Sequence, residues 1–255
     1  FTGNVSVLRN TSSSGSISFA TKVDFTVVGN CVAIAISDIN SDGKPDLLTV
    51  NKAGSSTVSV LRNTSTGSTI TFAAKVDFAT EENPWNVAID DFDLDGKPDL
   101  AVVNDVSNSV SVLKNQTTPG SITASSFAPA VNFATGAFPI GIDSKDLDGD
   151  GKSDLVVTNQ SDNSISILRN TSTVGSITAT SFAAKVDLAT GLDPYSVSIG
   201  DLNDNGKPDV VVANFSSGSL SVFDNISNSG SIDFLTKVDF TSGAGPLDVK
   251  LSDID

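Results

Sequence analysis

An acidic motif with the pattern Asp-x-Asp/Asn-x-Asp/Asn-Gly-x-x-Asp occurs four times in the chain. Side chains at the first, third and fifth positions can converge on one point if the loop curls, and glycine at the sixth position permits the sharp turn. The seventh residue offers a backbone carbonyl, and the ninth is an aspartate that closes the shell. Hard cations such as Ca²⁺ take about six to eight oxygen ligands of this kind. The motif therefore predicts about four calcium sites, one in each copy.

The candidate metal ligands are the side chains at positions one, three, five and nine and the carbonyl of the lysine at position seven. They are Asp38, Asn40, Asp42, Lys44 and Asp46; Asp91, Asp93, Asp95, Lys97 and Asp99; Asp146, Asp148, Asp150, Lys152 and Asp154; and Asp201, Asn203, Asn205, Lys207 and Asp209. At these ligand positions the four copies carry three, four, four and two carboxylates. Because affinity in such loops depends on ligand charge, we expect the fourth copy to release calcium first. A polar hairpin turn is the alternative interpretation of any single copy.

The composition excludes several other kinds of site. The chain has 30 acidic and 15 basic residues, and a net charge of −15 argues against nucleic acid as a partner. It contains no histidine, which excludes Ser-His-Asp catalysis and histidine-ligated zinc. Cys31 is the only cysteine, so no intrachain disulfide forms. Every dense pair of carboxylates belongs to an acidic motif, so we assign no catalytic residue and expect no enzyme activity from this segment.

The acidic motifs recur at a fixed period, which indicates a repeat architecture. The leading aspartates are separated by 53, 55, 55 and 52 residues, counting Asp253 as the start of a fifth copy. Each repeat contains four short apolar runs, rich in β-branched residues and separated by glycine, asparagine, serine and proline. Such runs are typical of strands, and four strands per repeat form one propeller blade. The sequence therefore predicts an all-β fold, a β-propeller of four-stranded antiparallel blades.

We expect residues 1–255 to form a single propeller domain or a fragment of one. The predicted repeats are a partial one at 1–29, complete ones at 30–82, 83–137, 138–192 and 193–244, and a partial one at 245–255. The chain opens with the third and fourth strands of a blade and ends with a first strand over Leu247 to Ser252. A seven-bladed ring of about 378 residues is the simplest complete form, and a five-bladed ring is the alternative. The chain begins at Phe1 and lacks methionine, so we expect it to be a piece of a longer protein.

The repeated unit resembles the FG-GAP/VCBS-type repeats of integrin-α-like propellers and of many bacterial secreted and surface proteins. The resemblance rests on an aliphatic strand, the acidic loop, and a second aliphatic strand that ends in Asn51, Asn104, Asn159 or Asn214. It implies Ca²⁺ in the hairpin between the first and second strands of each blade, and a secreted or cell-surface location. The chain lacks a clear Phe-Gly…Gly-Ala-Pro signature, which favours the VCBS-like bacterial branch over integrins.

The repeats differ most where one blade connects to the next. Trp85 and Tyr195, the only tryptophan and tyrosine, share one repeat position directly after a proline, and Phe138 lies in the corresponding connection. Variable loops on a rigid scaffold commonly carry binding sites, so these aromatic residues are candidates for contact with an extracellular protein or glycan. Filling gaps between blades is the alternative role. No apolar run approaches the ~20 residues needed to span a bilayer, so we expect no membrane insertion in this segment.

Three classes of function remain open. The favoured class is a calcium-stabilised adhesion or ligand-recognition module of a larger secreted or surface protein, of which a carbohydrate-binding lectin is a narrower version. The second is an accessory or catalytic propeller of a secreted polysaccharide-degrading enzyme, and the third is a structural spacer. An Asn-x-Ser/Thr pattern also recurs after each third strand, at Asn10, Asn63, Asn115, Asn170 and Asn225. It fits either N-glycosylation or a turn-forming asparagine, and the repeat itself favours the turn.

Overall fold

The computed structural model of the chain describes residues 3–27, 29–52, 54 and 56–252. Its strands form four antiparallel sheets of four strands each and one two-stranded sheet, and no helix occurs within these ranges. The strands are β1 (Gly3–Val7), β2 (Val23–Val27), β3 (Asn30–Ser37), β4 (Asp46–Lys52), β5 (Thr57–Leu61), β6 (Val76–Ala79), β7 (Pro84–Asp90), β8 (Asp99–Asn104), β9 (Ser109–Leu113), β10 (Val131–Ala134), β11 (Pro139–Lys145), β12 (Asp154–Asn159), β13 (Ser164–Leu168), β14 (Val186–Ala189), β15 (Pro194–Gly200), β16 (Asp209–Asn214), β17 (Ser219–Phe223) and β18 (Val238–Thr241).

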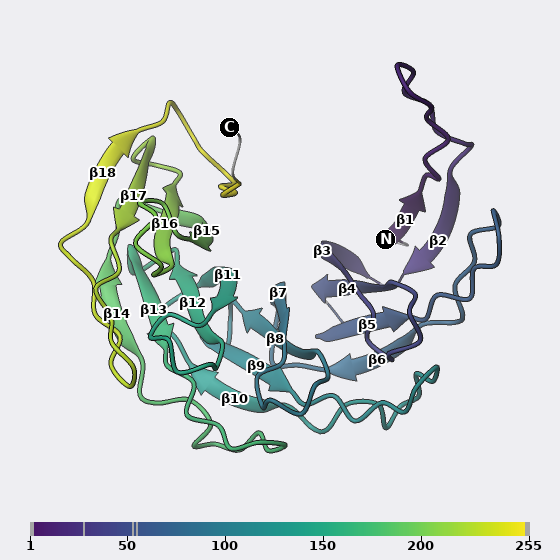
Figure 1. The fold of residues 1–255 in the computed structure, drawn as a ribbon, viewed down its shortest axis with the longest axis horizontal. Helices are drawn as coiled ribbons and strands as arrows, with labels where there is room; N and C mark the ends of the chain where they lie inside the picture. The colour runs from purple at the N-terminus through teal and green to yellow at the C-terminus, as the bar shows by residue number, and fades with distance from the viewer. Residues whose placement is uncertain (1–2, 28, 53, 55, 253–255) are drawn as a thin grey trace.

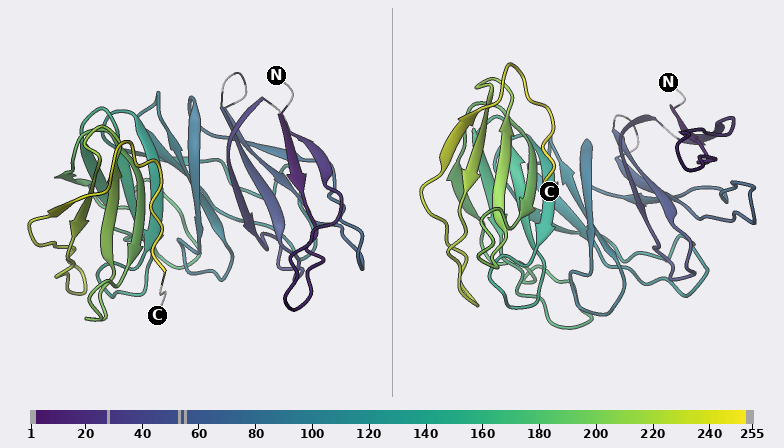
Figure 2. Two further views of the ribbon diagram at one scale, coloured as in Figure 1. Left: turned by 90° about the horizontal axis from the view of Figure 1, so that it is seen from above. Right: turned by 45° about the horizontal axis from the view of Figure 1, so that its top comes forward.

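The sheets follow one another around an arc, with the two termini on either side of its open part (Figure 1). In each four-stranded sheet the first strand lies toward the inside of the arc and the fourth strand lies outside. Strands in sequence order pair antiparallel within each sheet, and connecting loops gather at the two ends of the strands (Figure 2). This arrangement is that of propeller blades, which confirms the predicted all-β propeller. The number of blades in a complete ring stays a prediction.

The second strand of each blade is the most buried part of the fold. All six residues of β8, of β12 and of β16 are buried. Each begins with aspartate, ends with asparagine and is mostly aliphatic between them, as expected of strands that are covered on both faces. The core accordingly lies between blades, as where Leu48 and Val50 of β4 share a cluster with Leu100 and Val102 of β8. Each acidic loop thus leads into a buried strand.

The two ends of the described chain differ in how they match the expected partial blades. β1 and β2 pair antiparallel, as predicted for the third and fourth strands of a blade. The prediction of a strand over Leu247 to Ser252 is wrong, because this segment has no regular secondary structure. It runs beside β15, where the amides of Val249 and Leu251 donate to serine hydroxyls at 3.4 and 3.3 Å. Among the described residues no second strand lies next to it, so it lacks the hydrogen-bonding partner that β15 has in β16.

The predicted repeat boundaries stay a prediction. In the ranges that the structure covers, nothing is helical, long and apolar enough to cross a membrane.

Candidate functional site

The four acidic motifs form the hairpin loops that join the first strand of each blade to the second. In the second blade the loop runs from Asp91, directly after β7, to Asp99, the first residue of β8. The turn depends on Gly96, whose φ of 84° lies in the left-handed region that favours glycine. The sixth-position glycines of the other three loops have the same conformation, with φ of 81°, 85° and 81°. The repeated glycine therefore gives all four loops one curled shape.

Hydrogen bonds between carboxylates and backbone amides fix this curl. Asp91 accepts from the amides of Asp95 at 3.0 Å and Gly96 at 2.7 Å, which draws the loop around its first residue. At the other end, Asp99 accepts from the amide of Phe92 at 3.1 Å and from that of Asn115 at 2.7 Å. The aspartates at positions one and nine thus shape the loop and also face its centre.

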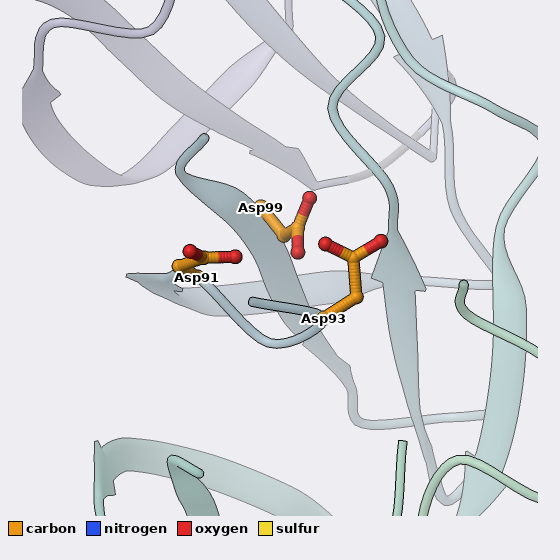
Figure 3. A group of neighbouring side chains, drawn as sticks. All are labelled: Asp91, Asp93 and Asp99. Carbon is orange, nitrogen blue, oxygen red and sulfur yellow. The ribbon is translucent and has the colours of Figure 1, made fainter. Parts of the chain in front are cut away.

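Two of the four loops bring three carboxylates close together. Ligand atoms of Asp91, Asp93 and Asp99 all lie within 4.8 Å of one another, and the same holds for Asp146, Asp148 and Asp154. Figure 3 shows the carboxyl groups of the first trio turned toward a common region. The first and fourth loops carry asparagine at the third position, so they present fewer carboxylates there. Either acidic cluster could hold a metal ion, and the fifth-position aspartates lie outside both trios.

The ninth-position aspartates have an electrostatic reason to accept a cation. Asp99 and Asp154 are fully buried. Desolvation by burial raises the pKa of each to about 7, and repulsion from the neighbouring loop carboxylates adds to this. Burial likewise raises the pKa of Asp46. A cation would favour the charged carboxylates, and the donor set of carboxylate, amide and carbonyl oxygens suits a hard ion such as Ca²⁺.

The seventh-position lysines have a structural role that their sequence position did not reveal. The side-chain amines of Lys44, Lys97 and Lys207 donate to backbone carbonyls of the long loop between the third and fourth strands of the same blade, at 2.9, 2.9 and 2.7 Å. These contacts hold two loops of one blade together. Coordination of a metal by the backbone carbonyls of these residues and of Lys152 stays a prediction.

Each of the first three acidic loops is joined to the next blade by one asparagine, a role that the sequence analysis missed. The side chains of Asn115, Asn170 and Asn225, here called the junction asparagines, are fully buried. Their Nδ2 atoms donate at 2.9 Å to the carbonyls of the second loop residue in the preceding blade, Ile39, Phe92 and Leu147.

Each junction asparagine also accepts through Oδ1 from the amide two residues later, at 2.8, 2.9 and 2.8 Å. This geometry confirms the turn interpretation of the Asn-x-Ser/Thr pattern. The burial leaves no room for a glycan at these three positions in the folded chain. The periodic asparagine was visible in the sequence, but its contact with a residue nearly 80 positions earlier was not.

The aromatic candidates lie at the opposite end of the blades from the acidic loops. Trp85 and Tyr195 are the second residues of β7 and β15, so they belong to inner strands and not to the connections. Each occupies a register shift, between Pro84 and Asn86 or between Pro194 and Ser196, where the strand has an extra residue. Such bulges re-aim a side chain out of the regular ladder. Phe138 precedes β11 with a φ of 57°, an uncommon conformation for a bulky residue.

The three aromatic residues do not form one cluster. The ammonium of Lys52 lies 3.6 Å from the ring centroid of Trp85 and 6.0 Å from that of Phe138. Lys52 also pairs with the buried carboxylate of Asp105 at 2.7 Å. Tyr195 instead faces Phe215, with ring centroids 6.2 Å apart. Trp85 is half-buried and packs against the core of the second and third blades, as the gap-filling alternative expects. Contact of these aromatic residues with a ligand stays a prediction.

Comparisons with known proteins agree with this geometry. The family model of the FG-GAP-like repeat matches residues 38–102, 91–157 and 146–212, each match running from one acidic loop to the second strand of the next blade. No curated protein matches the chain.

Among solved structures, BBS1N in complex with ARL6DN is 15% identical with a TM-score of 0.52, and the match covers 88% of this chain and 60% of that one. A virginiamycin B lyase from Staphylococcus aureus is 12% identical with a TM-score of 0.52, covering 94% of this chain and 74% of the lyase. A putative 6-phosphogluconolactonase from Bacteroides fragilis is 13% identical with a TM-score of 0.45, covering 98% and 80%. At these identities the likeness concerns the fold alone.

The family matches together span residues 38–212, more than half of the chain. They begin at the leading aspartates of the first three loops, and the carboxylate trios of the second and third blades lie within them. FG-GAP repeats commonly bind calcium and are typical of extracellular proteins, and their propeller fold suggests a protein-interaction module. The motif, its place between the first two strands of each blade and the family match agree, and the chain belongs to the FG-GAP-like repeat family.

Proposed function

We propose that this chain is a calcium-stabilised, extracellular propeller module that recognises a protein or glycan ligand. The observation that supports calcium binding most strongly is the pair of carboxylate trios within 4.8 Å, at equivalent positions in two successive blades. The side chains at positions one, three, five and nine and the carbonyl at position seven would hold the ion. Bound calcium supplies positive charge that offsets the repulsion among these carboxylates.

Stabilisation of the blades follows from where the loops lie. Each of the first three loops carries the carbonyl that a junction asparagine of the next blade contacts. An ion that orders the loop therefore also orders the contact between two blades. Modular extracellular calcium sites have dissociation constants of about 10⁻⁴ to 10⁻³ M, and the match to the FG-GAP-like repeat, which is typical of extracellular proteins, supports such a location for this module.

Ligand recognition is assigned to the end of the blades opposite the acidic loops. At this end the connections between blades differ in sequence, and Trp85 and Tyr195 lie at bulges. A flat aromatic ring suits the apolar face of a sugar or an anchoring side chain of a protein ligand. We assign no catalytic role, although two of the structural neighbours are named as a lyase and a putative lactonase. The dense carboxylates of this chain are engaged in shaping the acidic loops.

Thermal unfolding of the full chain in chelator, in Ca²⁺ and in Mg²⁺ tests the proposal. An ion that binds only the folded state adds about 2.7 kcal/mol per site at a hundredfold excess over its dissociation constant. We expect a clear fall of the melting temperature in chelator and its recovery in Ca²⁺, with a smaller effect of Mg²⁺.

The variant Asp91→Asn should lose part of the calcium-dependent rise in melting temperature, whereas Asp24→Asn, which changes an exposed carboxylate on β2, should keep it. A melting temperature that is the same in chelator and in Ca²⁺ would refute calcium stabilisation.

A further inference from the structure

In the second, third and fourth blades, the residue directly before the asparagine that follows the third strand contacts the acidic loop of its own blade. In the second blade this residue is Lys114, whose ammonium contacts the carboxylates of Asp93 and Asp95, the latter at 2.6 Å. In the third blade Arg169 contacts Asp148 at 2.6 Å and Asp150 at 3.0 Å. Both loops with four carboxylates therefore have a built-in cation at positions three and five, and we call this repeat position the facing residue.

The fourth blade has the opposite charge at the same position. Its facing residue is Asp224, and Nδ2 of Asn203 donates to Asp224 Oδ1 at 3.0 Å. The loop itself carries asparagine at both positions where the second and third loops carry aspartate. A carboxylate thus approaches the fourth loop from the third strand, in the place where Lys114 or Arg169 approaches the others.

The first blade combines a basic facing residue with an asparagine at position three of its loop. Its loop has Asn40 at position three, and the facing residue Arg62 donates instead to the carbonyl of Gly120 in the next blade, at 3.2 Å. Among the described residues, no hydrogen bond joins Arg62 to the first loop. The buried Nδ2 atom of Asn40 has no partner, as expected when an amide donor replaces the carboxylate oxygen that a cation would contact.

Counting the facing residue changes the charge comparison of the loops. At the ligand positions, four carboxylates and one cation leave −3 on the second and third loops, and two carboxylates with Asp224 leave the same −3 on the fourth. The fourth loop has a further, exposed carboxylate, Asp204, at its fourth position, which is not a ligand position. The loop motif alone gives −4, −4 and −2 for these three loops. The expectation that the fourth loop releases calcium first used only the motif.

We propose that the facing residue sets the calcium affinity of its loop, with Asp224 as an additional acidic group of the fourth site and Lys114 and Arg169 as cations that weaken the second and third. The proposal rests on the proposed calcium binding. It predicts that the fourth loop holds calcium about as tightly as the second. A unit charge about 4 Å from a divalent ion, even with solvent screening, corresponds to roughly a tenfold change in affinity.

A calcium titration of the full chain followed by amide NMR resolves the loops one by one. The sixth-position glycines, Gly43, Gly96, Gly151 and Gly206, provide one amide reporter in each loop. Lys114→Gln should lower the calcium midpoint at Gly96 about tenfold, and Lys114→Arg should leave it near that of the unmodified chain. Asp224→Asn should raise the midpoint at Gly206 about tenfold.

Arg62→Gln is the matched control, because this side chain donates its hydrogen bond to Gly120 of the next blade, and the midpoint at Gly43 should change less than twofold. The same spectra show whether each variant is folded. If Gly206 responds to calcium with an unchanged midpoint in Asp224→Asn, the role of the facing residue is wrong and calcium binding stands. If no loop glycine responds to calcium in the unmodified chain, calcium binding and this inference fail together.

Discussion

The two ends of the blades differ in how closely successive blades resemble one another. At the acidic end, the same contacts recur between successive blades, with a junction asparagine reaching the carbonyl of Ile39, Phe92 or Leu147. At the opposite end, the position of Trp85 is taken by Ile140 in the third blade and Tyr195 in the fourth. The contacts that repeat from blade to blade lie at the acidic end, where they join neighbouring blades. The residues that differ between blades lie at the opposite end.

A single glycine position shows how variation alters the structure at the opposite end. Gly136 donates its amide to Asn159 Oδ1 at 3.0 Å. A Cβ atom on this glycine would come within 2.7 Å of Asn159 Cγ, so only glycine allows the approach. The second blade has Glu81 there, and the buried Oδ1 of Asn104, the equivalent of Asn159, has no hydrogen-bond partner. At the opposite end, the hydrogen bond to this asparagine is therefore present in the third blade and absent in the second. At the acidic end, the bond from the junction asparagine is present in all three junctions.

The largest expected effect concerns pH and the acidic end. Burial raises the folded-state pKa of Asp99 and of Asp154 to about 7, from the ordinary aspartate value of 3.8. Between these values the folded chain binds protons that the unfolded chain has released, so the metal-free chain loses stability as pH rises from about 4 to 7. The loss is on the order of several kcal/mol.

Urea unfolding of the metal-free chain across this pH range measures the effect. Saturating calcium should largely abolish the decline, because the ion favours the charged carboxylates. A metal-free stability that rises steadily to pH 7 would mean that these two carboxylates are not the buried acids described here.

The next largest effect concerns the junction asparagines. Asn170→Ala removes the donor to the carbonyls of Phe92 and Ser153 and the acceptor for the amide of Ser172. Leaving buried polar groups unpaired should cost about 3 kcal/mol of unfolding free energy. Asn10→Ala is the matched control, because Asn10 is exposed at the same repeat position, and it should cost less than about 0.5 kcal/mol. Equal losses in urea unfolding would show that the contact between blades contributes nothing.

The smallest effect is expected at the opposite end. Trp85→Ala removes a half-buried ring that contacts Lys52, and it should cost about 2 kcal/mol, less than truncation of a fully buried tryptophan. Tyr195→Ala should cost about 1 kcal/mol, since Tyr195 makes one tilted contact with Phe215. Both variants should weaken ligand binding on a glycan or protein array while keeping the calcium-dependent rise in melting temperature. Large losses of stability with unchanged binding would assign these rings to packing.

The sequence was sufficient for the blades because each one repeats the same alternation of apolar runs and turns. It also placed the acidic loops between the correct strands, since Gly96 and its equivalents mark the turn. It was not sufficient for contacts between blades, such as that of Asn170 with Phe92, which join residues far apart in the chain. The strand predicted over Leu247 to Ser252 has the right apolar pattern, but the described residues contain no second strand of the same blade, and pattern alone cannot supply a hydrogen-bonding partner.

Equilibrium dialysis of the metal-free full chain against radioactive calcium tests the central claim most directly, because it counts bound ions without any assumption about stability. We expect about four ions per chain at saturation, and about three in the double variant Asp91→Asn/Asp93→Asn, which changes two carboxylates of one trio and keeps their shape. A count near zero, or a count that the double variant leaves unchanged, would contradict the assignment of the acidic loops as calcium sites.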